Sequence, residues 1–593
     1  MAEENGPESR VVATAGHVDH GKSTLVRTLT GIDPDRWAEE KARGLTIDLG
    51  FAHTVLPSGT GISFVDVPGH IRFLRNMLAG VGAVDACLFV VAATEGWKEQ
   101  SEEHLRIIEL LGIRHGIIAM TKVGLVDDEW AELARMDIED RVAGTFLEGA
   151  PVVAVDAPTG RGVGDLRNAL DSLLKAVDPP DNIARPRLWV DRVFAAKGSG
   201  TVVTGTLTGG SFFVDDAVEV HGPLGLQTAR IRSLQAHNAP RTSVGPGTRL
   251  AVNLAGIDHH DVARGDALVG PNAWFSTRRF DAQLTVLASL DHAVSRRGAY
   301  AIHIGSGEYH TKVRILGDVA FEPGAAGPVR LYLPNALPLL PGDRFVLREH
   351  GREETIGGGA VLDVDPVRPA SKAQPADDIA HIVRERRAIL VTELHRRSRQ
   401  TWTGEVLDGW AFDSDALVDA RARVLHAVDA AGSLGLDAAI LSERDRSVAQ
   451  HSLADEVRID GGRIVRREQV DPLADHWFIG MLTNGGFTPP DAAGVDRAEL
   501  RELVRRKLVV EQDGLWFAPA AIDRAGELVA ELLVHQPEGI TVSEIRDALA
   551  TTRKFALPIL AVLDSSGVLR RRGDLRIGGP RLPRLPSLPG LLE

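Results

Sequence analysis

A short stretch near the start of the chain, residues 16–24, constrains the fold more than any other feature. It runs G-H-V-D-H-G-K-S-T and matches the pattern G-x-x-x-x-G-K-[ST]. An apolar run at Val11–Ala13 precedes it, and a helix-like pattern that starts at Leu25 follows. In a strand–loop–helix unit of this kind, backbone N–H groups and the helix N-terminus cradle phosphate. The sequence therefore predicts an α/β domain with a phosphate-binding loop.

Each side chain of this loop has an expected task. Lys22 is expected to reach the terminal phosphates and Ser23 to hold Mg²⁺. The glycines allow the N–H groups to point inward. The candidate nucleotide contacts in the loop are Asp19, His20, Gly21, Lys22, Ser23 and Thr24.

Two later segments suit the metal and the last phosphate. Asp66 follows an apolar strand pattern and is expected to order Mg²⁺ through water, and Gly69 leaves its N–H free for a γ-phosphate. Between the loop and Asp66, the hydroxyl of Thr46 is a second candidate Mg²⁺ ligand. The order of these elements indicates a nucleotide switch.

Two segments near the end of the domain suit a base. Thr121 and Lys122 follow a predicted strand, and the lysine stem is suited to stack on a base. Asp156 and Ala157 follow the next strand, where the Ala157 N–H can meet a base oxygen. Five elements in this order predict a GTP-binding domain.

The motifs G-H-V-D-H-G-K-S-T and D-V-P-G-H together resemble those of the translational GTPases. This resemblance implies that His70 positions the attacking water, a task that suits an imidazole because it can hydrogen-bond both water and backbone. Residues 29–33 and 39–51 resemble a narrower family, the bacterial selenocysteine-specific elongation factors of the SelB type.

Two positions depart from the family pattern. Where the family has [NT]-K-x-D, with an aspartate that accepts two hydrogen bonds from guanine, this chain has Gly124. Asp127 and Asp128 lie nearby, but the sequence does not show that either replaces it. Asp156 stands where the family has serine. Loss of a charged acceptor predicts weaker guanine selection, by about 1.5–3 kcal/mol.

Composition indicates a multidomain globular protein. A chain of 593 residues is too long for one core, and 44% apolar and 25% charged residues are ordinary values. No apolar run approaches the ~18 residues of a membrane span. Residues 1–10 are polar and acidic, without a signal-peptide core, and Cys87 is the only cysteine, so disulfides are excluded. We expect a cytoplasmic monomer without a membrane partner.

Changes in residue pattern divide the chain into four regions. Residues 1–178 alternate strands and helices, as a doubly wound GTP-binding domain does. Residues 184–272 and 277–366 are rich in β-branched runs and glycine turns and predict two small β-barrels. Residues 376–593 predict tandem, mostly helical, winged-helix modules, about four in number, the last at about 521–580. The family resemblance implies that the barrels grip an aminoacyl-tRNA.

Three residues of the first barrel carry a sharper expectation. By resemblance, Asp191, Arg192 and Arg249 form a pocket for the selenocysteinyl group. A selenol is largely ionised at neutral pH and a serine hydroxyl is not, so two arginines favour the selenium form. The aspartate is suited to hold the α-amino group.

The modular region is marked by recurring turns. Asp408-Gly409, Asp460-Gly461, Asp513-Gly514 and Gly573-Asp574 lie between β-forming residues at intervals of about 55 residues. Each predicts a tight hairpin that closes a helical module, which is the pattern of winged helices.

The last module is the expected RNA reader. Thr541 and Glu544 form a capping box, and Pro558 implies that the following helix either begins near Leu557 or is kinked. From residue 551 onward, eight Lys and Arg residues face three acids in a chain of net charge −14. A local basic surface on an acidic protein suggests one anionic partner. The candidate contacts are Arg553, Lys554, Arg570, Arg571 and Arg572.

These features, with the partners that the family resemblance implies, indicate a factor that binds GTP and Mg²⁺, carries selenocysteinyl-tRNA and docks on an mRNA hairpin (SECIS). It would deliver the tRNA at a recoded UGA codon and hydrolyse GTP on the ribosome. Two alternatives remain open. One is a general tRNA-delivering or initiation GTPase. The other is a GTP-switched regulator whose winged helices bind nucleic acid and which has no tRNA partner.

Overall fold

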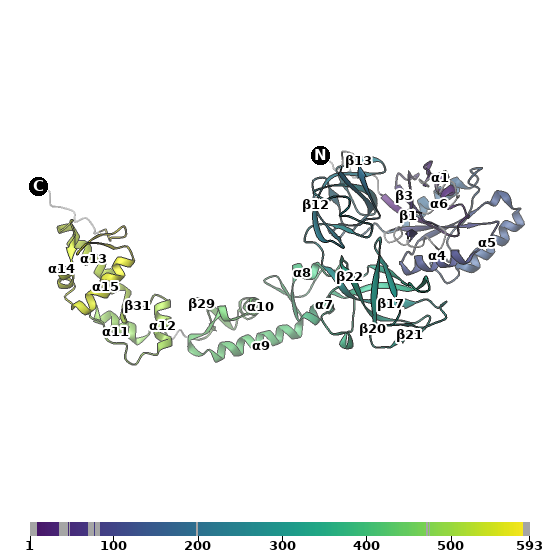
Figure 1. The fold of residues 1–593 in the computed structure, drawn as a ribbon. Helices are drawn as coiled ribbons and strands as arrows, with labels where there is room; N and C mark the ends of the chain where they lie inside the picture. Colours follow the sequence, from purple (N-terminus) through teal and green to yellow (C-terminus); the bar gives the residue numbers. More distant parts are fainter. Residues whose placement is uncertain are drawn as a thin grey trace. The chain divides into compact units, whose positions relative to one another are not determined.

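The computed structural model of the chain describes residues 9–34, 46, 48–68, 76–77, 84–196, 200–469, 473 and 475–584. The described chain forms two units, divided between Asp413 and Ser414. The first unit contains an α/β domain, two β-barrels and one helix–hairpin module, and the second contains three more modules (Figure 1). This is the multidomain fold class that the sequence predicts.

The α/β domain is built on one six-stranded sheet in the order β2-β3-β1-β4-β5-β6. All neighbouring strands are parallel except β2 and β3. The carboxyl ends of β1, β3, β4 and β5 therefore share one edge, where ligands bind in such sheets. The strands are β1 (Ser9–Ala15), β2 (Gly50–Val55), β3 (Gly61–Asp66), β4 (Ala86–Ala92), β5 (Gly116–Thr121) and β6 (Val152–Ala154).

Alternate residues of the buried strands face two separate apolar layers. Val11 and Ala13 pack with helices α4 and α5, whereas Val12 packs with α1 and α6 on the opposite face. Continuous apolar strands are typical of a sheet that is covered on both sides. The helices are α1 (Lys22–Thr30), α4 (Glu99–Leu110), α5 (Asp128–Val142) and α6 (Val163–Ala176), and a short 3₁₀ turn, η2, spans Val123–Leu125.

Six strands of the first barrel close in the order β11-β16-β7-β9-β15-β12, and β12 pairs back with β11. Its inward residues, Val203, Leu207 and Val252 among them, form one buried core. The barrel strands are β7 (Arg187–Trp189), β9 (Gly200–Thr208), β11 (Ala217–Gly222), β12 (Gly225–Ala236), β15 (Thr248–Ala255) and β16 (Ala267–Val269), with β8 (Arg192–Ala196) on β9, β13 (Ala239–Arg241) on β12, and the pair β10 (Phe212–Phe213) and β14 (Ser243–Val244).

The second barrel is closed in the order β17-β22-β20-β19-β23-β24. Phe280 and Phe345 meet edge to face in its core, with ring centroids 6.4 Å apart. Its strands are β17 (Ser276–Val286), β19 (Tyr300–Ile304), β20 (Gly307–Ile315), β22 (Ala326–Pro338), β23 (Arg344–Glu349) and β24 (Glu354–Asp363), with the pair β18 (Val294–Ser295) and β21 (Ala320–Phe321).

A buried ion pair joins the two barrels. Arg187 of the first barrel donates from Nη1 and Nη2 to the Asp343 carboxylate of the second, at 2.6 and 2.7 Å. Arg399 of the first helix–hairpin module adds a third bond to the same carboxylate, at 2.6 Å. Burial by itself would raise the pKa of Asp343, but these two guanidiniums hold that pKa at about 2. The barrels and the first module therefore share one electrostatic joint.

All four predicted hairpins are present. Asp408-Gly409 and Asp513-Gly514 have positive φ at both residues, as the tight two-residue turn requires. In the second module the turn lies one residue later than expected, at Gly461-Gly462, because Asp460 pairs across the hairpin with Arg463. Two successive glycines adopt positive φ without strain, so they take the turn in preference to aspartate.

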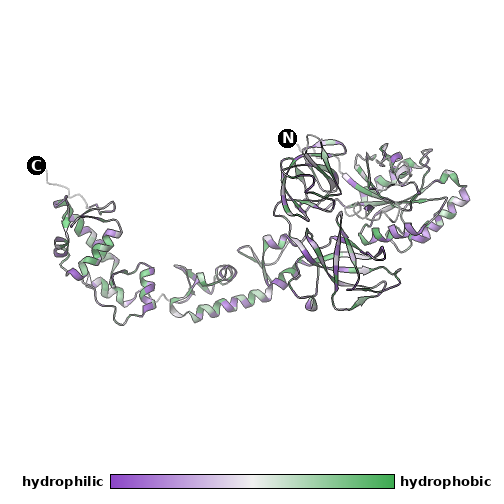
Figure 2. Cartoon of the chain, in the orientation of Figure 1, coloured by the Kyte–Doolittle hydropathy of each residue, from purple (hydrophilic) through white to green (hydrophobic). Residues whose placement is uncertain are grey.

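The first two modules have short strands and helices. The first contains α7 (Ile379–Arg386), β25 (Ala388–Leu390), α8 (Val391–His395), β26 (Val406–Leu407) and β27 (Trp410–Phe412), after a 3₁₀ turn, η3 (Ala370–Lys372). The second contains α9 (Ser414–Ala430), η4 (Gly432–Leu434), β28 (Leu436–Asp437), η5 (Ala438–Ile440), α10 (Glu443–Ser447), a π-helical turn, η6 (Val448–Ser452), β29 (Val457–Asp460) and β30 (Arg463–Arg466). Hydrophilic and hydrophobic residues alternate along α9 (Figure 2), which buries one face through Leu417, Val424 and Val428.

The last two modules form the end of the second unit. The third contains α11 (Trp477–Gly485), α12 (Arg497–Arg505), β31 (Val510–Gln512) and β32 (Leu515–Phe517). The fourth contains α13 (Pro519–His535), β33 (Ile540–Thr541), α14 (Val542–Ala548), α15 (Arg553–Ser565), β34 (Leu569–Arg572) and β35 (Leu575–Gly578). The capping box of Thr541 and Glu544 is present. Helix α15 begins at Arg553 and includes Pro558, so of the two alternatives for this helix, the one with a start near Leu557 is wrong.

Among the described residues, no helix is both long enough and apolar enough to span a membrane.

The joint between the barrels gives a stability prediction. We expect Asp343→Asn to lower the stability of the barrel region by about 3–5 kcal/mol, because it leaves the buried Arg187 guanidinium and the partly buried Arg399 guanidinium without their counter-charge. The depressed pKa means that the contribution of Asp343 is present above its unfolded pKa near 4 and is lost as the pH falls toward 2. Thermal unfolding followed by calorimetry measures both effects.

The matched control is Asp215→Asn, which removes the partner of Arg230 in an exposed pair with side-chain exposures of 64% and 71%. We expect a change within about 0.5 kcal/mol for that variant. Equal unfolding transitions for the two variants would contradict the role of Asp343 as a joint.

Candidate functional site

The loop between β1 and α1 is shaped by three backbone positions. Gly16 has φ of +127°, and a Cβ there would lie 2.1 Å from the carbonyl oxygen of Val90. Gly21 has φ of +84° and precedes the first helical residue, and Asp19 also has a positive φ of 64°. The glycines are therefore required by the path of the loop, and not only by the approach of a ligand.

Lys22 lies inside this loop. Its side chain is buried, and Nζ donates to the carbonyl oxygens of Gly16 and His17 at 3.1 and 2.8 Å. The ammonium therefore lies among the loop's own oxygens, beside the N-terminus of α1, where phosphate oxygens are favoured.

Two hydroxyl groups and one carboxylate gather at the same edge of the sheet. Ser23 Oγ and Thr46 Oγ1 are 2.8 Å apart, although they come from different segments. Asp66, the last residue of β3, is fully buried and accepts a 2.7 Å bond from Thr14 Oγ1. Hydroxyl and carboxylate oxygens in this number suit a hard divalent cation such as Mg²⁺.

The carboxyl end of β5 contacts the phosphate loop directly. Thr121 Oγ1 donates to the carbonyl oxygen of His20 at 2.7 Å. Lys122 has a positive φ of 58°, and its Nζ lies 3.0 Å from a carboxylate oxygen of Glu95. The predicted base-binding and phosphate-binding segments are therefore in contact with each other.

Two buried histidines support the loop, and only one of them was predicted as a site residue. The imidazole of His20 lies against the Val90 carbonyl, and burial lowers its pKa to about 4. His104 of α4 accepts the Gly16 N–H at Nδ1, 3.1 Å away, and burial lowers its pKa to about 3. Both rings are neutral at pH 7. No motif in the sequence marks His104, because its partner is distant in the chain.

Some predicted residues lie outside the described part of the chain. His70, the predicted catalytic residue, and Gly69 belong to the segment 69–75.

Two further predicted nucleotide contacts are described. Thr24 is exposed on the first turn of α1, and Ala157 is half-buried after β6.

Asp191, Arg192 and Arg249, the three residues of the predicted pocket, are neighbours in the structure. Arg249 makes a bidentate ion pair with Asp191, with N–O distances of 2.5 and 3.0 Å. Thr204 Oγ1 adds a 2.7 Å bond to Asp191, so this carboxylate already accepts three hydrogen bonds. Arg192 donates to the Leu49 carbonyl and lies 3.7 Å from Asp48.

Phe51, which the sequence does not single out, lies under both guanidiniums. Its ring centroid is 3.4 Å from the central carbon of Arg249 and 4.5 Å from that of Arg192. These three residues, with His53 and His237, line a cavity of about 170 Å³ between the α/β domain and the first barrel. The two imidazoles are stacked 5.0 Å apart, and burial lowers both pKa values, so the arginines carry the positive charge there.

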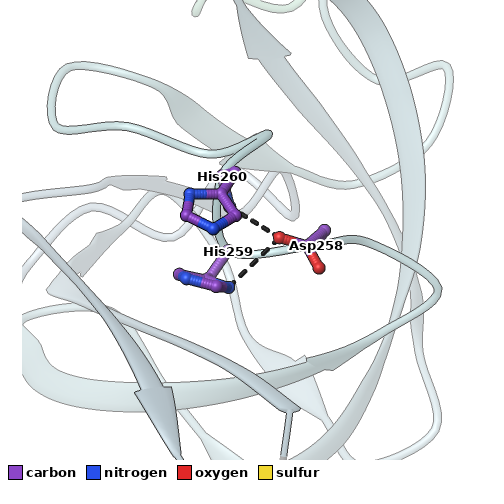
Figure 3. A group of neighbouring side chains, drawn as sticks. All are labelled: Asp258, His259 and His260. Atoms are coloured by element: carbon purple, nitrogen blue, oxygen red, sulfur yellow. Dashed lines mark hydrogen bonds and ion pairs between the residues drawn. The ribbon is translucent and has the colours of Figure 1, made fainter.

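A second group of metal-ligating side chains lies in a loop of the first barrel (Figure 3). Asp258 Oδ1 lies 3.1 Å from His259 Nδ1 and accepts the His260 N–H at 2.9 Å. Asp258 and His260 are exposed. The three residues are consecutive, and the aspartate bonds within its own turn, which is an ordinary turn arrangement.

The predicted RNA contacts belong to two elements of the fourth module. Arg553 and Lys554 are the first two residues of α15, and Arg570, Arg571 and Arg572 lie exposed on β34, which packs against α15. Arg576 differs, because it is buried in an ion pair with Asp564 at 2.9 Å.

A groove of about 590 Å³ passes the start of α15. Trp516, Phe555, Arg553 and Lys554 line it, so aromatic and basic side chains share one surface. Trp516 is half-buried.

Comparison with known proteins agrees with this architecture. Residues 7–176 match the model of the elongation factor Tu GTP binding domain. Residues 281–368 match the selenocysteine-specific elongation factor beta-barrel domain, and residues 531–577 match the elongation factor SelB winged helix. Each of the three regions is thus matched separately.

Individual similar proteins are also described as selenocysteine-specific elongation factors. The selenocysteine-specific elongation factor of Desulfomicrobium baculatum is 39% identical over 60% of this chain and 55% of its own length, so the match spans just over half of that relative. The corresponding factor of Haemophilus influenzae is 28% identical over 95% of this chain and 98% of its own. A crystal structure of a bacterial selenocysteine-specific elongation factor, EF-Sec, is 26% identical, has a TM-score of 0.72, and is matched over 96% of this chain and 100% of that one.

A phosphate-loop domain followed by two barrels, with these matches, defines a translational GTPase of the elongation factor Tu class. Within that class, the chain belongs to the family of selenocysteine-specific elongation factors.

The backbone of the loop gives a direct prediction. We expect Gly16→Ala to weaken nucleotide binding by about 10- to 100-fold, because the added Cβ overlaps the Val90 carbonyl and the residue must leave its φ. Titration with a fluorescent GDP analogue measures the affinity, and thermal unfolding shows whether the domain remains folded.

Gly164→Ala is the control, since Gly164 lies in α6 with no atom within 4 Å of an added Cβ. A Gly16→Ala chain that binds nucleotide as tightly as this control would show that the loop path is dispensable.

Proposed function

We propose that this chain is an elongation factor that delivers selenocysteinyl-tRNA to the ribosome at a recoded UGA codon. The observation that carries the proposal is the pair Arg192 and Arg249 stacked on Phe51, in a cavity joined to the segment that holds Thr46. Family membership supports it, because the relatives carry this description.

GTP is the nucleotide in this proposal. The loop N–H groups and Lys22 hold the phosphates, and Thr121, Lys122 and Ala157 hold the base. Ser23 and Thr46 supply hydroxyl ligands for Mg²⁺, and Asp66 orders its water. Mg²⁺ would neutralise charge on the phosphates as the terminal bond breaks.

His70 is proposed to align the attacking water, by resemblance to the family. A neutral imidazole can accept a hydrogen bond from the water that attacks the γ-phosphate, so its task is positioning.

The cavity under the first barrel is proposed as the selenocysteinyl pocket. Arg192, Arg249 and Arg264 bring three positive charges to this region, whereas Asp48 and Asp191 bring two negative charges. The remaining positive charge favours an ionised selenol over a neutral serine hydroxyl. Selenocysteine and serine side chains are similar in size, so a difference in charge distinguishes them more strongly than size does.

The pocket and the nucleotide are joined by a short stretch of chain. Thr46 lies three residues before Leu49 and four residues before Gly50, where β2 begins. Phe51 is the second residue of β2. Arg192 donates to the Leu49 carbonyl, so the pocket contacts this segment directly. Loss of the γ-phosphate would release Thr46, shift the segment and loosen the grip on the tRNA.

The fourth winged helix is proposed to bind an mRNA hairpin, the SECIS element. Arg553 and Lys554 add charge to the positive end of α15, which is unfavourable for the helix alone but favours phosphate. Trp516 and Phe555 beside them offer faces on which unpaired bases can stack. This tether would raise the local concentration of the factor at one codon.

The proposed pocket predicts which amino acid on the tRNA is preferred. With GTP, the chain should bind selenocysteinyl-tRNA at least about tenfold more tightly than seryl-tRNA on the same tRNA body, and Arg192→Met should remove most of that preference. Filter binding measures both affinities.

Arg230→Met is the control, since Arg230 lies in the same barrel in an exposed ion pair and does not line the cavity. Equal affinity for the two tRNAs would favour a general tRNA-delivering GTPase. Absence of tRNA binding together with DNA binding would favour a nucleic-acid-binding regulator.

The proposed RNA-binding surface of the fourth module predicts how binding of an RNA hairpin depends on salt. Arg571→Ala should weaken binding of a hairpin RNA taken from a selenoprotein message, and should reduce the slope of log K against log salt by about one. Fluorescence anisotropy at several salt concentrations measures the slope. Arg524→Ala, on α13 of the same module, should leave it unchanged, and an unchanged slope in both variants would remove β34 from the interface.

A further inference from the structure

The two positions that depart from the family pattern are in contact. Gly124 lies in η2, directly after β5, and Asp156 follows the neighbouring strand β6. A Cβ built on Gly124 would lie 2.9 Å from Cγ and Oδ2 of Asp156, and 3.2 Å from Oδ1. The carboxyl group of Asp156 therefore fills the space into which a side chain at position 124 would project.

The backbone does not explain the glycine at position 124. Its φ lies outside the left-handed region, unlike that of Gly160 (+79°) and Gly162 (+75°) in the neighbouring turn. An L-residue could adopt this backbone conformation, and the obstacle is the Asp156 carboxyl group. The glycine and the aspartate therefore fit each other as a pair.

The Asp156 carboxylate is held in one orientation. The residue is 7% exposed, and its Oδ2 accepts a 2.5 Å hydrogen bond from Thr159 Oγ1. Its backbone N–H donates to the Arg161 carbonyl at 2.9 Å, and its carbonyl accepts from the Gly160 N–H at 2.9 Å. A carboxylate fixed in this way can accept hydrogen bonds from a ligand at little further entropic cost.

Neighbouring acids are engaged elsewhere. Asp127, one of the two nearby candidates in the sequence, caps α5 by accepting the Trp130 N–H at 2.8 Å. Asp128 is exposed in the first turn of that helix. Glu95 is paired with Lys122 at 3.0 Å. Asp156 is thus the buried carboxylate beside Gly124.

We propose that Asp156 supplies the carboxylate that selects guanine, in place of a residue at position 124. Guanine presents two adjacent donors, N1–H and the N2 amino group, which match the two oxygens of one carboxylate. Adenine presents an acceptor at N1, which a carboxylate repels. This inference rests on the proposed binding of GTP at this site, and it replaces the expectation of weakened guanine selection.

The test is a change of base preference in the full-length chain. Asp156→Asn should weaken binding of fluorescent GDP by about 10- to 100-fold and strengthen binding of the xanthosine analogue, because the amide offers an N–H to the xanthine O2. Asp127→Asn is the matched control and should leave the ratio of the two affinities unchanged.

A double variant guards against simple loss of folding. Gly124→Asp alone should weaken GDP binding, because two carboxyl groups would meet within about 3 Å. Gly124→Asp combined with Asp156→Ser moves the carboxylate back to position 124 and should recover GDP affinity to within about tenfold of the unchanged chain.

The outcomes separate this inference from the proposed function. An unchanged chain that binds neither GDP nor GTP would overturn the proposed function. If the unchanged chain binds GDP but Asp156→Asn does not alter the base preference, only the proposed role of Asp156 is overturned. The same conclusion follows if the double variant binds GDP no better than the two single variants.

Discussion

The structure of the α/β domain depends on the close approach of the phosphate loop to the strand beside it. Gly16 passes so near the Val90 carbonyl that no side chain fits between them. The loop is then fixed from two further sides, by His104 on the Gly16 N–H and by Thr121 on the His20 carbonyl. A loop fixed in this way can present its N–H groups without reorganisation when an anion arrives.

Strand β2 connects the region of the phosphate loop to the first barrel. Thr46 meets Ser23 at the proposed metal position, and the chain continues into β2, whose Phe51 lies under the guanidiniums of Arg192 and Arg249. Covalent continuity and a few contacts thus connect the proposed nucleotide site to the cavity under the first barrel. The ion pair of Arg187 with Asp343 holds the second barrel to the first.

At the proposed base site, two departures from a pattern lie next to each other and are inferred to compensate. Taken alone, Gly124 predicts a weaker site because the carboxylate of the family pattern is lost, whereas Asp156 adds a carboxylate where the family has serine. In the folded chain they are neighbours, and the carboxylate stays in the same space while its point of attachment changes. Position in space, and not position in the motif, decides whether the acceptor is present.

The sequence by itself determined the fold class, the phosphate loop and the four hairpins, because each depends on residues adjacent in the chain. Glycine at positive φ and the Asp-Gly turns act over a few residues, so pattern is sufficient. Only the tertiary structure placed His104 on the loop, Phe51 under the arginines, and the Asp156 carboxyl group beside Gly124. These contacts join segments distant in sequence, and their geometry is set by packing, which no local pattern records.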